Sequence, residues 1–359
     1  MSQVYVFAGG GTGGHIFPAL AIAEHLAGSR CVFVCSDRPL DAQILGKAGA
    51  EFRIIPAKPV GVRPRALLRF LRSWGPSIRA SRGLLREIRN SGGAPVVVAM
   101  GGFVAAPVAQ AARAERVPLI LVNMDVIPGK ANRWISRRAS RIVTSAPVPG
   151  STWERVPPIV RAAAKASGTA AECRAALGLD PSMRTLLVTG ASQGARSVNT
   201  LLTSLLGTNR TAFDGWQVIH QTGSGEDAAV HAAYQSAGIP ALVRPFFDGM
   251  GLAWGAADAA VSRAGAGSVA EAWSNAVPTV FLPYPYHRDQ HQKHNAEPLA
   301  SAGAAVIETD PVIGGQGAAA AVLALLCDGR RREAMRRAYQ PLGPADGAER
   351  IAAILRSVR

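Results

Sequence analysis

The sequence predicts an α/β fold made of two doubly wound parallel-sheet domains, and three observations support it. The first is a repeated order of short apolar run, glycine-rich turn and helical pattern, in which parallel strands alternate with helices. The second is that this order begins at Val4–Ala8 and starts again at Thr185–Thr189. The third is length, because 359 residues exceed one ordinary compact domain and suit two separate cores.

The first predicted strand, Val4–Ala8, runs into the turn Gly9–His15 and then a helical pattern over Pro18–Leu26. A glycine turn between a strand and a helix can cradle a phosphate or let the backbone approach a ligand. The glycine spacing differs from the dinucleotide-binding fingerprint, although Asp37 after the next apolar run would suit a dehydrogenase. At the helix entrance, His15 predicts a general base with a near-neutral pKa. The alternative is that His15 only hydrogen-bonds the loop.

The segment Lys58–Arg89 is strongly basic, with nine cations against the single acid Glu87 and with apolar side chains between them. A basic amphipathic helix or helix pair with exposed aromatic residues is typical of contact with an anionic membrane. An RNA-binding surface would use the same residue types, but no nucleic-acid-binding module is recognisable elsewhere. The remaining alternative is a solvated helix whose apolar side packs on the sheet. A net charge of +15 also favours a polyanionic or phosphorylated partner.

Three further apolar runs, Ala94–Met100, Pro118–Asn123 and Arg141–Ser145, are expected to complete the first sheet. Gly101-Gly102-Phe103 and Met124–Gly129 follow the first two of these runs. Because the carboxyl ends of parallel strands lie at one edge of a sheet, these turns and the first glycine turn should line one cleft. Prolines then break regular structure and predict an interdomain linker: Pro147, Pro149, Pro157 and Pro158.

The second half repeats the pattern with the strands Thr185–Thr189, Trp216–Gln221 and Val243–Phe246. The turn after the first of them, Gly190–Arg196, gathers hydroxyl, amide and guanidinium donors around glycines. Phe247 follows the third strand, so an aromatic ring at its end would be able to cover a flat base.

The stretch Asp258–Ala296 has the pattern of a strand, a glycine turn, a helix and a second strand. Ser268 is the expected N-cap of the helix. Free backbone N–H groups and the positive end of a helix dipole at a strand end predict a phosphate. Glu271, placed in the first helical turn, would then accept hydrogen bonds from two ribose hydroxyls, so the unit predicts a nucleotide. The alternative is that Glu271 only complements the helix dipole.

The composition favours a soluble protein of a reducing compartment. Hydrophobic residues make up 48% of the chain, and 38 Gly with 24 Pro suit many tight turns rather than disorder. No basic region precedes the first apolar run, so no signal peptide is predicted and a cytoplasmic location is expected. Four cysteines lack zinc-ligand spacing and are expected to be buried free thiols: Cys31, Cys35, Cys173 and Cys327.

Seven ordered motifs give the chain a resemblance to a known family: GGGTGGHIFPALAIAEHL, GGFVAAP, GASQGAR, IHQTG, FFDGM, SRAGAGSVAE and DQHQKHNA. Their order and spacing resemble the MurG family of UDP-N-acetylglucosamine transferases of peptidoglycan synthesis, over nearly the whole chain. The resemblance implies the GT-B architecture, two Rossmann-like domains that face each other across a cleft. It also implies an inverting transfer of N-acetylglucosamine to the C4 hydroxyl of undecaprenyl-diphospho-muramoyl-pentapeptide, with no metal or other cofactor.

Motif by motif, the resemblance assigns roles to single residues. His15 would be the catalytic base and would lie with Thr12 near the acceptor, while Glu271 would bind the ribose. The residues counted with the donor are Thr12, Gly13, Gly14, Arg161, Ser192, Gly194, Phe246, Phe247, Arg263, Ala266, Glu271, His291 and Gln292. Those counted with the acceptor are Gly101, Gly102, Phe103, Asn123 and Asp125.

The resemblance also implies a domain plan. Residues 1–160 would bind the acceptor and carry the membrane-facing segment, residues 161–345 would bind the UDP-sugar, and residues 346–359 would form a helix that packs back on the N-terminal domain. The expected partners are a UDP-sugar donor, a polyprenyl-diphosphate-linked acceptor and an anionic membrane surface, without nucleic acid. The expected location is cytoplasmic, peripheral on the inner face of the plasma membrane.

Two departures from the family pattern leave alternatives open. Val122-Asn123-Met124-Asp125 stands where the family usually reads His-Glu-Gln-Asn, and Pro158-Ile159-Val160-Arg161 lacks the family's Asn. Polar groups at such positions decide which hydroxyls of a ligand are satisfied, so the donor is better determined than the acceptor. The alternatives are a related transferase with another acceptor, a UDP-N-acetylglucosamine epimerase, and a non-catalytic nucleotide-sugar binder.

Overall fold

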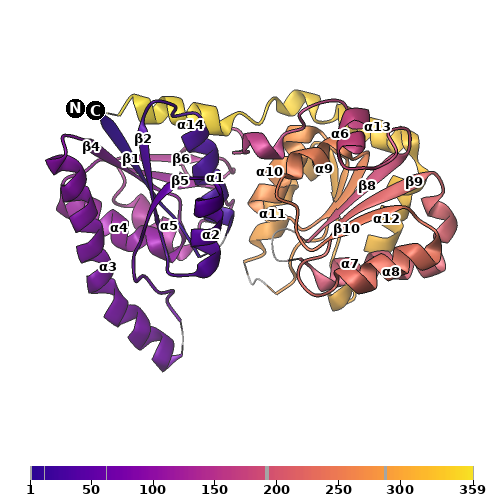
Figure 1. The fold of residues 1–359 in the computed structure, drawn as a ribbon, viewed down its shortest axis with the longest axis horizontal. Coiled ribbons are helices and arrows are strands. Elements are labelled where there is room, and N and C mark those ends of the chain that lie inside the picture. The colour runs from indigo at the N-terminus through magenta and orange to yellow at the C-terminus, as the bar shows by residue number, and fades with distance from the viewer. Residues whose placement is uncertain (1, 12, 62, 191–193, 287–288, 359) are drawn as a thin grey trace. The chain divides into compact units, whose positions relative to one another are not determined.

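The computed structural model describes residues 2–11, 13–61, 63–190, 194–286 and 289–358, and Figure 1 shows the fold. Contacts divide the chain into two compact units: Met1–Arg161 with Asp346–Arg359, and Ala162–Ala345. Each unit holds one sheet in which all strand pairings are parallel. The predicted fold class is therefore confirmed.

The N-terminal unit is built on a seven-stranded sheet in the order β3-β2-β1-β4-β5-β6-β7. Its strands are β1 (Gln3–Ala8), β2 (Arg30–Cys35), β3 (Glu51–Ile54), β4 (Ala94–Ala99), β5 (Leu119–Asn123), β6 (Arg141–Thr144) and β7 (Glu154–Arg155). Its helices are α1 (Gly13–Glu24), α2 (Pro39–Lys47), α3 (Pro64–Asn90), α4 (Gly102–Ala114), α5 (Lys130–Ser136) and α14 (Gly347–Arg356). Helices cover both faces of this sheet (Figure 1), so its central strands are buried on both sides and appear in the sequence as continuous apolar runs.

The basic segment forms one long helix, α3, rather than a pair of helices. Its second half packs on α4 and buries Leu84, Leu85 and Ile88. Its first half leaves Leu67, Leu68 and Leu71 exposed. The single helix thus has a packed half and an exposed, apolar and basic half.

The last helix of the chain, α14, belongs to the N-terminal unit and contacts α1. Gly347 begins this helix, and its N–H donates to the carbonyl of Pro158 at 3.1 Å. A Cβ on Gly347 would lie 1.9 Å from the carbonyl oxygen of Pro157. Glycine is therefore required where the returning chain meets the proline-rich stretch.

The C-terminal unit is built on a six-stranded sheet in the order β10-β9-β8-β11-β12-β13. Its strands are β8 (Arg184–Thr189), β9 (Trp216–Gln221), β10 (Ala241–Arg244), β11 (Ala259–Ser262), β12 (Thr279–Phe281) and β13 (Ala305–Ile307). Its α-helices are α6 (Ala170–Ala176), α7 (Arg196–Thr208), α8 (Asp227–Ala237), α9 (Met250–Ala256), α10 (Ala266–Asn275), α11 (His291–Ser301), α12 (Gly317–Cys327) and α13 (Gly329–Arg337). Its short 3₁₀ turns are η1 (Ala162–Ala164), η3 (Arg210–Phe213), η4 (Pro311–Ile313) and η5 (Gln340–Leu342).

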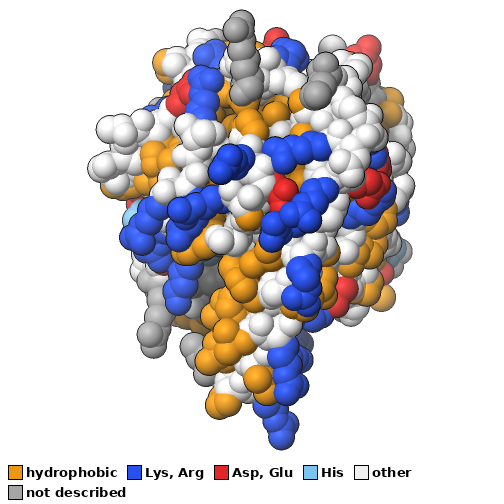
Figure 2. Space-filling view, turned by 90° about the vertical axis from the view of Figure 1, so that its left-hand side faces the viewer, with side chains coloured by type: hydrophobic (Ala, Val, Ile, Leu, Met, Phe, Trp, Pro, Cys, Tyr) orange, Lys and Arg blue, Asp and Glu red, His pale blue; other side chains and the backbone are white. Residues whose placement is uncertain are grey.

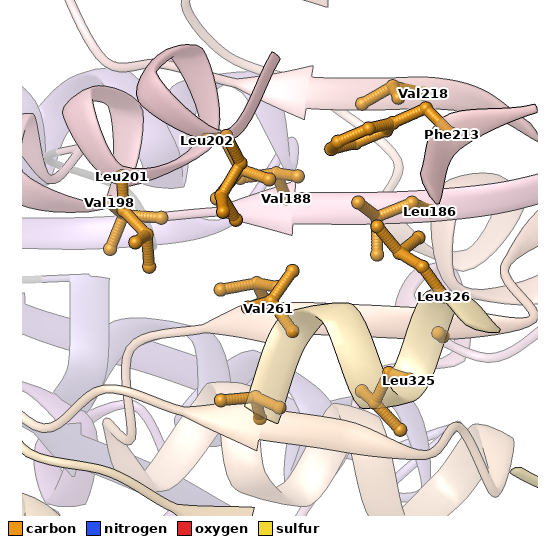
Figure 3. Packing of buried hydrophobic residues seen from close by; sticks show 14 of the residues in the cluster. Leu186, Val188, Val198, Leu201, Leu202, Phe213, Val218, Val261, Leu325 and Leu326 are labelled. Atoms are coloured by element: carbon orange, nitrogen blue, oxygen red, sulfur yellow. The ribbon is translucent and has the colours of Figure 1, made fainter. Parts of the chain in front are cut away.

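Side chains of the second sheet alternate between two cores. Leu186, Val188 and Val261 belong to the core that contains α7 and α12, as Figure 3 shows. Leu187 and Ala260 point to the opposite core, which contains α9 and α10. Burial on both faces holds the strand ends in place, and the strand ends carry the loops described below.

Two local expectations are wrong. Helix α10 begins at Ala266 with Gly265 as its N-cap, so Ser268 does not cap it and Glu271 lies in the second turn. Of the four cysteines, Cys35 and Cys173 are buried free thiols as predicted, but Cys31 is half-buried and Cys327 is exposed. Within the described part of the chain, no helix combines the length and the apolar character needed to cross a membrane.

Candidate active site

The first glycine turn is held by a buried carboxylate. The N–H of Gly11 donates to both oxygens of Asp41, at 3.0 and 2.7 Å, and Asp41 also accepts from the hydroxyl of Ser36 at 2.6 Å. Gly11 has φ +88°, and a Cβ there would lie 2.4 Å from the ring of Phe103. Asp41 is fully buried. It was not predicted as a functional residue, because it lies 30 positions after the turn that it holds.

His15 lies in the first turn of α1, against the second glycine turn. A Cβ on Gly101 would be 3.2 Å from Nε2 of His15, and one on Gly102 would be 3.4 Å from its Nδ1. Both glycines have positive φ, +101° and +74°. The structure thus brings together three predicted residues from two separate turns.

Burial lowers the pKa of His15, while the carboxylates of Asp125 and Asp41 act in the opposite direction. Burial is the larger cause, so the imidazole is neutral at pH 7 and can accept a proton. The electrostatic environment therefore suits the predicted role of general base. Asp125, which was predicted to bind the acceptor substrate, is half-buried, and its negative charge acts to raise the pKa of His15.

Asn132 is a neighbour of this site that the sequence did not indicate. Its side chain is 6% exposed, and its Nδ2 donates to Oδ1 of Asn123 at 3.0 Å. Its Oδ1 is buried without a hydrogen-bond partner among the described residues, and lies 2.7 Å from the Cβ position of Gly101. An unsatisfied buried acceptor costs stability, so Asn132 adds a polar group beside His15 whose hydrogen bond is not made within the described residues.

Asn123 was predicted to contact the acceptor, but its position in the structure does not fit that role. It is fully buried at the end of β5, and its Nδ2 donates to the carbonyl of Asp125 at 2.7 Å and to Oγ1 of Thr144 at 3.1 Å. Both the nitrogen and the oxygen of its side-chain amide are hydrogen-bonded within the N-terminal unit. Asn123 therefore fixes the loop that carries Asp125, and it orients Asn132.

Of the remaining predicted residues in this unit, Gly13 and Gly14 form the first turn of α1, with Gly13 buried and Gly14 exposed. Phe103 is half-buried at the start of α4, and its ring packs 5.4 Å from the guanidinium of Arg38. Thr12 lies outside the described residues, as does Ser192 of the other unit.

Arg161 was expected in the donor domain, but its contacts lie in the N-terminal unit. Its Nε is 3.4 Å from a carboxylate oxygen of Glu24, and its guanidinium stacks 5.4 Å from the ring of Phe17. Both partners are on α1. This placement differs from the expected one because a linker residue can pack on either flanking domain, and its neighbours in sequence do not show which. Contact of Arg161 with the donor stays a prediction.

Glu271 is half-buried on α10, and its Oε2 accepts a hydrogen bond from Nε1 of Trp254 at 2.8 Å. Trp254 is fully buried. The indole therefore orients the carboxylate. Ala266, the first residue of α10, precedes Glu271 on the same helix and is also half-buried.

The two phenylalanines after β10 are not equivalent. Phe246 is 43% exposed, whereas Phe247 is 3% exposed and belongs to the core beside α9. The backbone N–H of Phe247 donates to Oε1 of Gln221 at 3.1 Å. The ring of Phe247 is therefore used in the core, which corrects the prediction that it borders a base, while for exposed Phe246 that role stays a prediction.

Gly194 packs against the turn after β9. It has φ +73°, and a Cβ there would lie 2.3 Å from the carbonyl oxygen of Thr222. In the stretch that follows β12, Nδ1 of His291 is 2.9 Å from Oδ1 of Asp289. Oε1 of Gln292 accepts a hydrogen bond from the backbone N–H of Tyr284 at 2.9 Å. Gly194 lies in a strand-end loop, whereas His291 and Gln292 are the first two residues of α11, the helix that follows the loop after β12.

Arg263 was predicted to bind the donor, but it is 7% exposed and its guanidinium is used inside the unit. It forms an ion pair with the fully buried Asp310 and donates to the hydroxyl of Ser197 at 2.8 Å. Direct contact with a ligand is therefore not its role. Among the described residues, no group of three or more His, Cys, Asp or Glu side chains could hold a metal ion.

A buried histidine also lies behind the Gly194 turn. His220 is fully buried, with Nε2 3.0 Å from Oδ1 of Asn199 and Nδ1 3.0 Å from the hydroxyl of Tyr234. Asn199 in turn donates to the carbonyl of Thr222 at 3.1 Å. The network thus fixes the turn against which Gly194 packs.

Burial lowers the pKa of His220 to about 3. In the unfolded chain the imidazole titrates near its ordinary value of 6.5. Between these two values the unfolded state binds more protons, so stability should fall as the pH falls from 6.5 towards 3. From pH 6 to pH 5 we expect His220 to account for a loss of about 1 kcal/mol.

The measurement is the free energy of unfolding by denaturant at several pH values, for the wild type and His220→Gln. The difference between the two curves isolates this residue from the carboxylates, which titrate in both proteins. Parallel curves from pH 6.5 to pH 4 would show that His220 is not buried as a neutral ring.

Both halves of the chain match known domains. Residues 5–144 match the glycosyltransferase family 28 N-terminal domain, and residues 185–351 match the glycosyltransferase family 28 C-terminal domain. A protein from Nocardioides sp. is 34% identical over 360 residues, covering 98% of this chain and 96% of its own. One from Acidothermus cellulolyticus is 36% identical over 359 residues, covering 97% and 95%. Both are named UDP-N-acetylglucosamine–N-acetylmuramyl-(pentapeptide) pyrophosphoryl-undecaprenol N-acetylglucosamine transferase.

Solved structures share the fold. A crystal structure of MurG from Acinetobacter baumannii matches with a TM-score of 0.74 at 23% identity, covering 100% of both chains. A crystal structure of a UDP-N-acetylglucosamine 2-epimerase matches with a TM-score of 0.66 at 13% identity, covering 99% of this chain and 96% of that one. At these identities the likeness concerns architecture alone.

Two parallel-sheet domains, each with glycine turns at its strand ends, together with this architecture define a glycosyltransferase of the GT-B class. Within that class, the chain belongs to the MurG family of family 28 glycosyltransferases. The two relatives that bear the name of this N-acetylglucosamine transferase align with it over nearly their full length.

Proposed function

We propose that this protein transfers N-acetylglucosamine from UDP-N-acetylglucosamine to the C4 hydroxyl of undecaprenyl-diphospho-muramoyl-pentapeptide, with inversion and without a metal ion or other cofactor. One observation carries the proposal: relatives 34% and 36% identical, which bear the name of this activity, align over at least 95% of both chains. Alignment of that extent includes both domains, so donor and acceptor regions are both represented.

In the proposed reaction, the C4 oxygen of the acceptor forms a bond to the anomeric carbon of the donor sugar. The bond from that carbon to the diphosphate breaks, and UDP leaves with the electron pair. Neutral His15 takes the proton of the attacking hydroxyl.

On the donor side, Glu271 accepts hydrogen bonds from the ribose hydroxyls and Phe246 covers the uracil. The starts of α7 and α10 offer backbone N–H groups and positive helix ends to the diphosphate. Such groups stabilise the charge that develops on departing UDP, as a bound cation would in other enzymes. His291 and Gln292 contact the sugar.

The test is an assay of the protein with UDP-N-acetylglucosamine and the lipid-linked acceptor, with the disaccharide product identified by mass. Formation of the product only when both substrates are present supports the proposal. UDP release with some other acceptor alone would favour a related transferase, and isomerised sugar nucleotide without any acceptor would favour an epimerase. Binding of UDP without any turnover would favour a non-catalytic nucleotide-sugar binder.

We also propose that the exposed half of α3 binds an anionic membrane, where a lipid-linked acceptor would be found. Leu67, Leu68 and Leu71 are 44%, 47% and 59% exposed, and Val60 just before the helix is 64% exposed. Figure 2 shows apolar side chains and Lys or Arg side chains side by side on this face. Apolar side chains flanked by cations are the pattern of helices that lie in a membrane interface. This contact would place the protein on the inner face of the plasma membrane.

Arg69→Gln is expected to weaken binding to vesicles that contain anionic lipid by about 1 kcal/mol, or about fivefold, because one cation near the surface is lost. Arg86→Gln is the matched control: it removes the same charge from the same helix, in the packed half, where Arg86 pairs with Glu115 at 2.9 Å. Co-sedimentation with vesicles measures both. Equal losses for the two variants would contradict a docking site in the exposed half.

A further inference from the structure

We propose that Arg263, Asp310 and Ser197 form a buried clamp that fixes the positions of four loops of the donor site relative to one another. The inference rests on the proposed function, because it takes the donor nucleotide to bind at the carboxyl edge of the C-terminal sheet. The three residues are positioning residues, since none of them needs to touch the ligand.

The clamp is largely buried, and its three side chains are hydrogen-bonded to one another. Arg263 donates through Nη1 to Oδ2 of Asp310 at 2.5 Å and through Nη2 to the hydroxyl of Ser197 at 2.8 Å. The hydroxyl of Ser197 donates to the same Oδ2 at 2.7 Å. The side chains of Arg263 and Asp310 are 9% and 0% exposed. All three groups are therefore held in one fixed triangle.

Each member lies in the connection that follows a different strand. Arg263 follows β11 and leads into α10, Asp310 lies after β13, and Ser197 lies in the first turn of α7, just after the Gly190–Arg196 turn. Nη1 of Arg263 also shares its two hydrogens with the carbonyl oxygens of Leu282 at 2.8 Å and Pro283 at 3.2 Å, in the loop after β12. One guanidinium thus joins the loops that follow β8, β11, β12 and β13.

These four loops carry most of the residues proposed to bind the donor. Gly194 is in the first loop and Glu271 is on the helix that follows Arg263. The loop after β12 leads through Tyr284 to Gln292, whose Oε1 accepts from the N–H of Tyr284. A shift of any one loop would move its ligand-binding groups relative to those of the others.

Stability alone does not explain a buried ion pair at this place. Desolvation of two charges offsets much of their attraction, and well-packed apolar residues are often as stabilising. An apolar side chain, however, would not hold the carbonyls of Leu282 and Pro283 or the hydroxyl of Ser197 at set distances. The planar guanidinium does so because its donors diverge in fixed directions.

The same strand offers a matched control at its other end. Asp258, just before β11, accepts from Arg174 at 2.7 Å and from the N–H of Thr185 at 2.8 Å. This second ion pair is also largely buried, with side chains 9% and 23% exposed. It lies at the amino edge of the sheet, away from the strand ends that carry the donor loops.

The test compares Asp310→Asn with Asp258→Asn in the full-length protein. Each change removes one buried negative charge without changing the shape of the side chain. We expect Asp310→Asn to weaken UDP binding, measured by calorimetry, about tenfold, and to raise the KM for the sugar nucleotide more than the KM for the acceptor. Asp258→Asn should lower the unfolding temperature yet keep the wild-type affinity for UDP.

Ser197→Ala is the milder variant, used in case Asp310→Asn does not fold. We expect it to weaken UDP binding about threefold, because one bridging hydroxyl is lost. Wild-type UDP affinity in folded Asp310→Asn, or in Ser197→Ala if that is the variant that folds, would overturn the clamp while leaving the proposed function intact. Failure of the wild type to bind UDP would instead overturn the donor assignment, and the clamp with it.

Discussion

Replacement of His15 by alanine is expected to lower kcat by about 10²- to 10⁴-fold, the usual contribution of a general base. The affinity for UDP should stay close to that of the wild type, because His15 lies in the N-terminal unit and its role is confined to proton transfer. The measurement is steady-state kinetics with both substrates varied, together with UDP titration. Loss of UDP affinity with unchanged kcat would contradict the assignment.

The pH dependence of kcat/KM gives an independent check on His15. Because burial lowers its pKa, the imidazole stays neutral, and able to accept a proton, below its ordinary value of 6.5. The acid limb of the rate profile should therefore lie below pH 6.5 and should disappear in His15→Ala. His25→Ala removes an imidazole from the far end of the same helix region and should leave both rate and profile unchanged. An acid limb retained in His15→Ala would assign the base to another group.

Glu271→Ala is expected to weaken UDP binding by about 1 to 3 kcal/mol, or about 5- to 150-fold, through the loss of the ribose hydrogen bonds. This substitution also leaves the indole N–H of buried Trp254 without its acceptor, so the free energy of unfolding should fall as well. Calorimetric titration with UDP at a temperature where the variant is folded separates the two effects.

Glu271→Gln refines this test, because the amide oxygen can still accept from Trp254 while the negative charge is lost. We expect UDP affinity between those of Glu271→Ala and the wild type, with stability near that of the wild type. Glu297→Ala, on α11 of the same unit, is the charge-matched control and should leave UDP affinity unchanged. A Glu271→Ala protein that binds UDP as tightly as wild type would refute the ribose role.

The strands could be predicted because each central strand of these sheets is buried on both faces. Many of these strands appear as short, largely apolar runs, and the predicted strands Val4–Ala8, Trp216–Gln221 and Arg141–Ser145 match β1, β9 and β6 to within a residue or so at each end. Helix starts were harder to predict. Helices α1 and α10 begin within glycine turns, and Gly265 caps α10 without a side-chain hydrogen bond, so the usual N-cap signal is missing.

Site residues could be predicted as a group from their motifs, but the roles of single side chains depended on their neighbours in space. Phe246 and Phe247 are adjacent in sequence, yet only the second enters the core. Arg263 was indicated as a donor ligand, and its ion pair with Asp310, 47 positions later, gives it a different role. No local pattern in the sequence shows such a partner.

By itself, the sequence determined that the chain has two parallel-sheet domains, that glycine turns follow the strands, and that the motifs are those of a UDP-sugar transferase. These features depend on the order of residues along the chain, since burial of a strand and the freedom of glycine are local properties. Only the tertiary structure decided that half-buried His15 lies beside Gly101 and Asn132, that Asp41 holds the first turn, and that the side chains of Asn123 and Arg263 are hydrogen-bonded inside their units. The physical reason is that hydrogen bonds, desolvation and ion pairing depend on distances between groups that lie tens of residues apart in sequence.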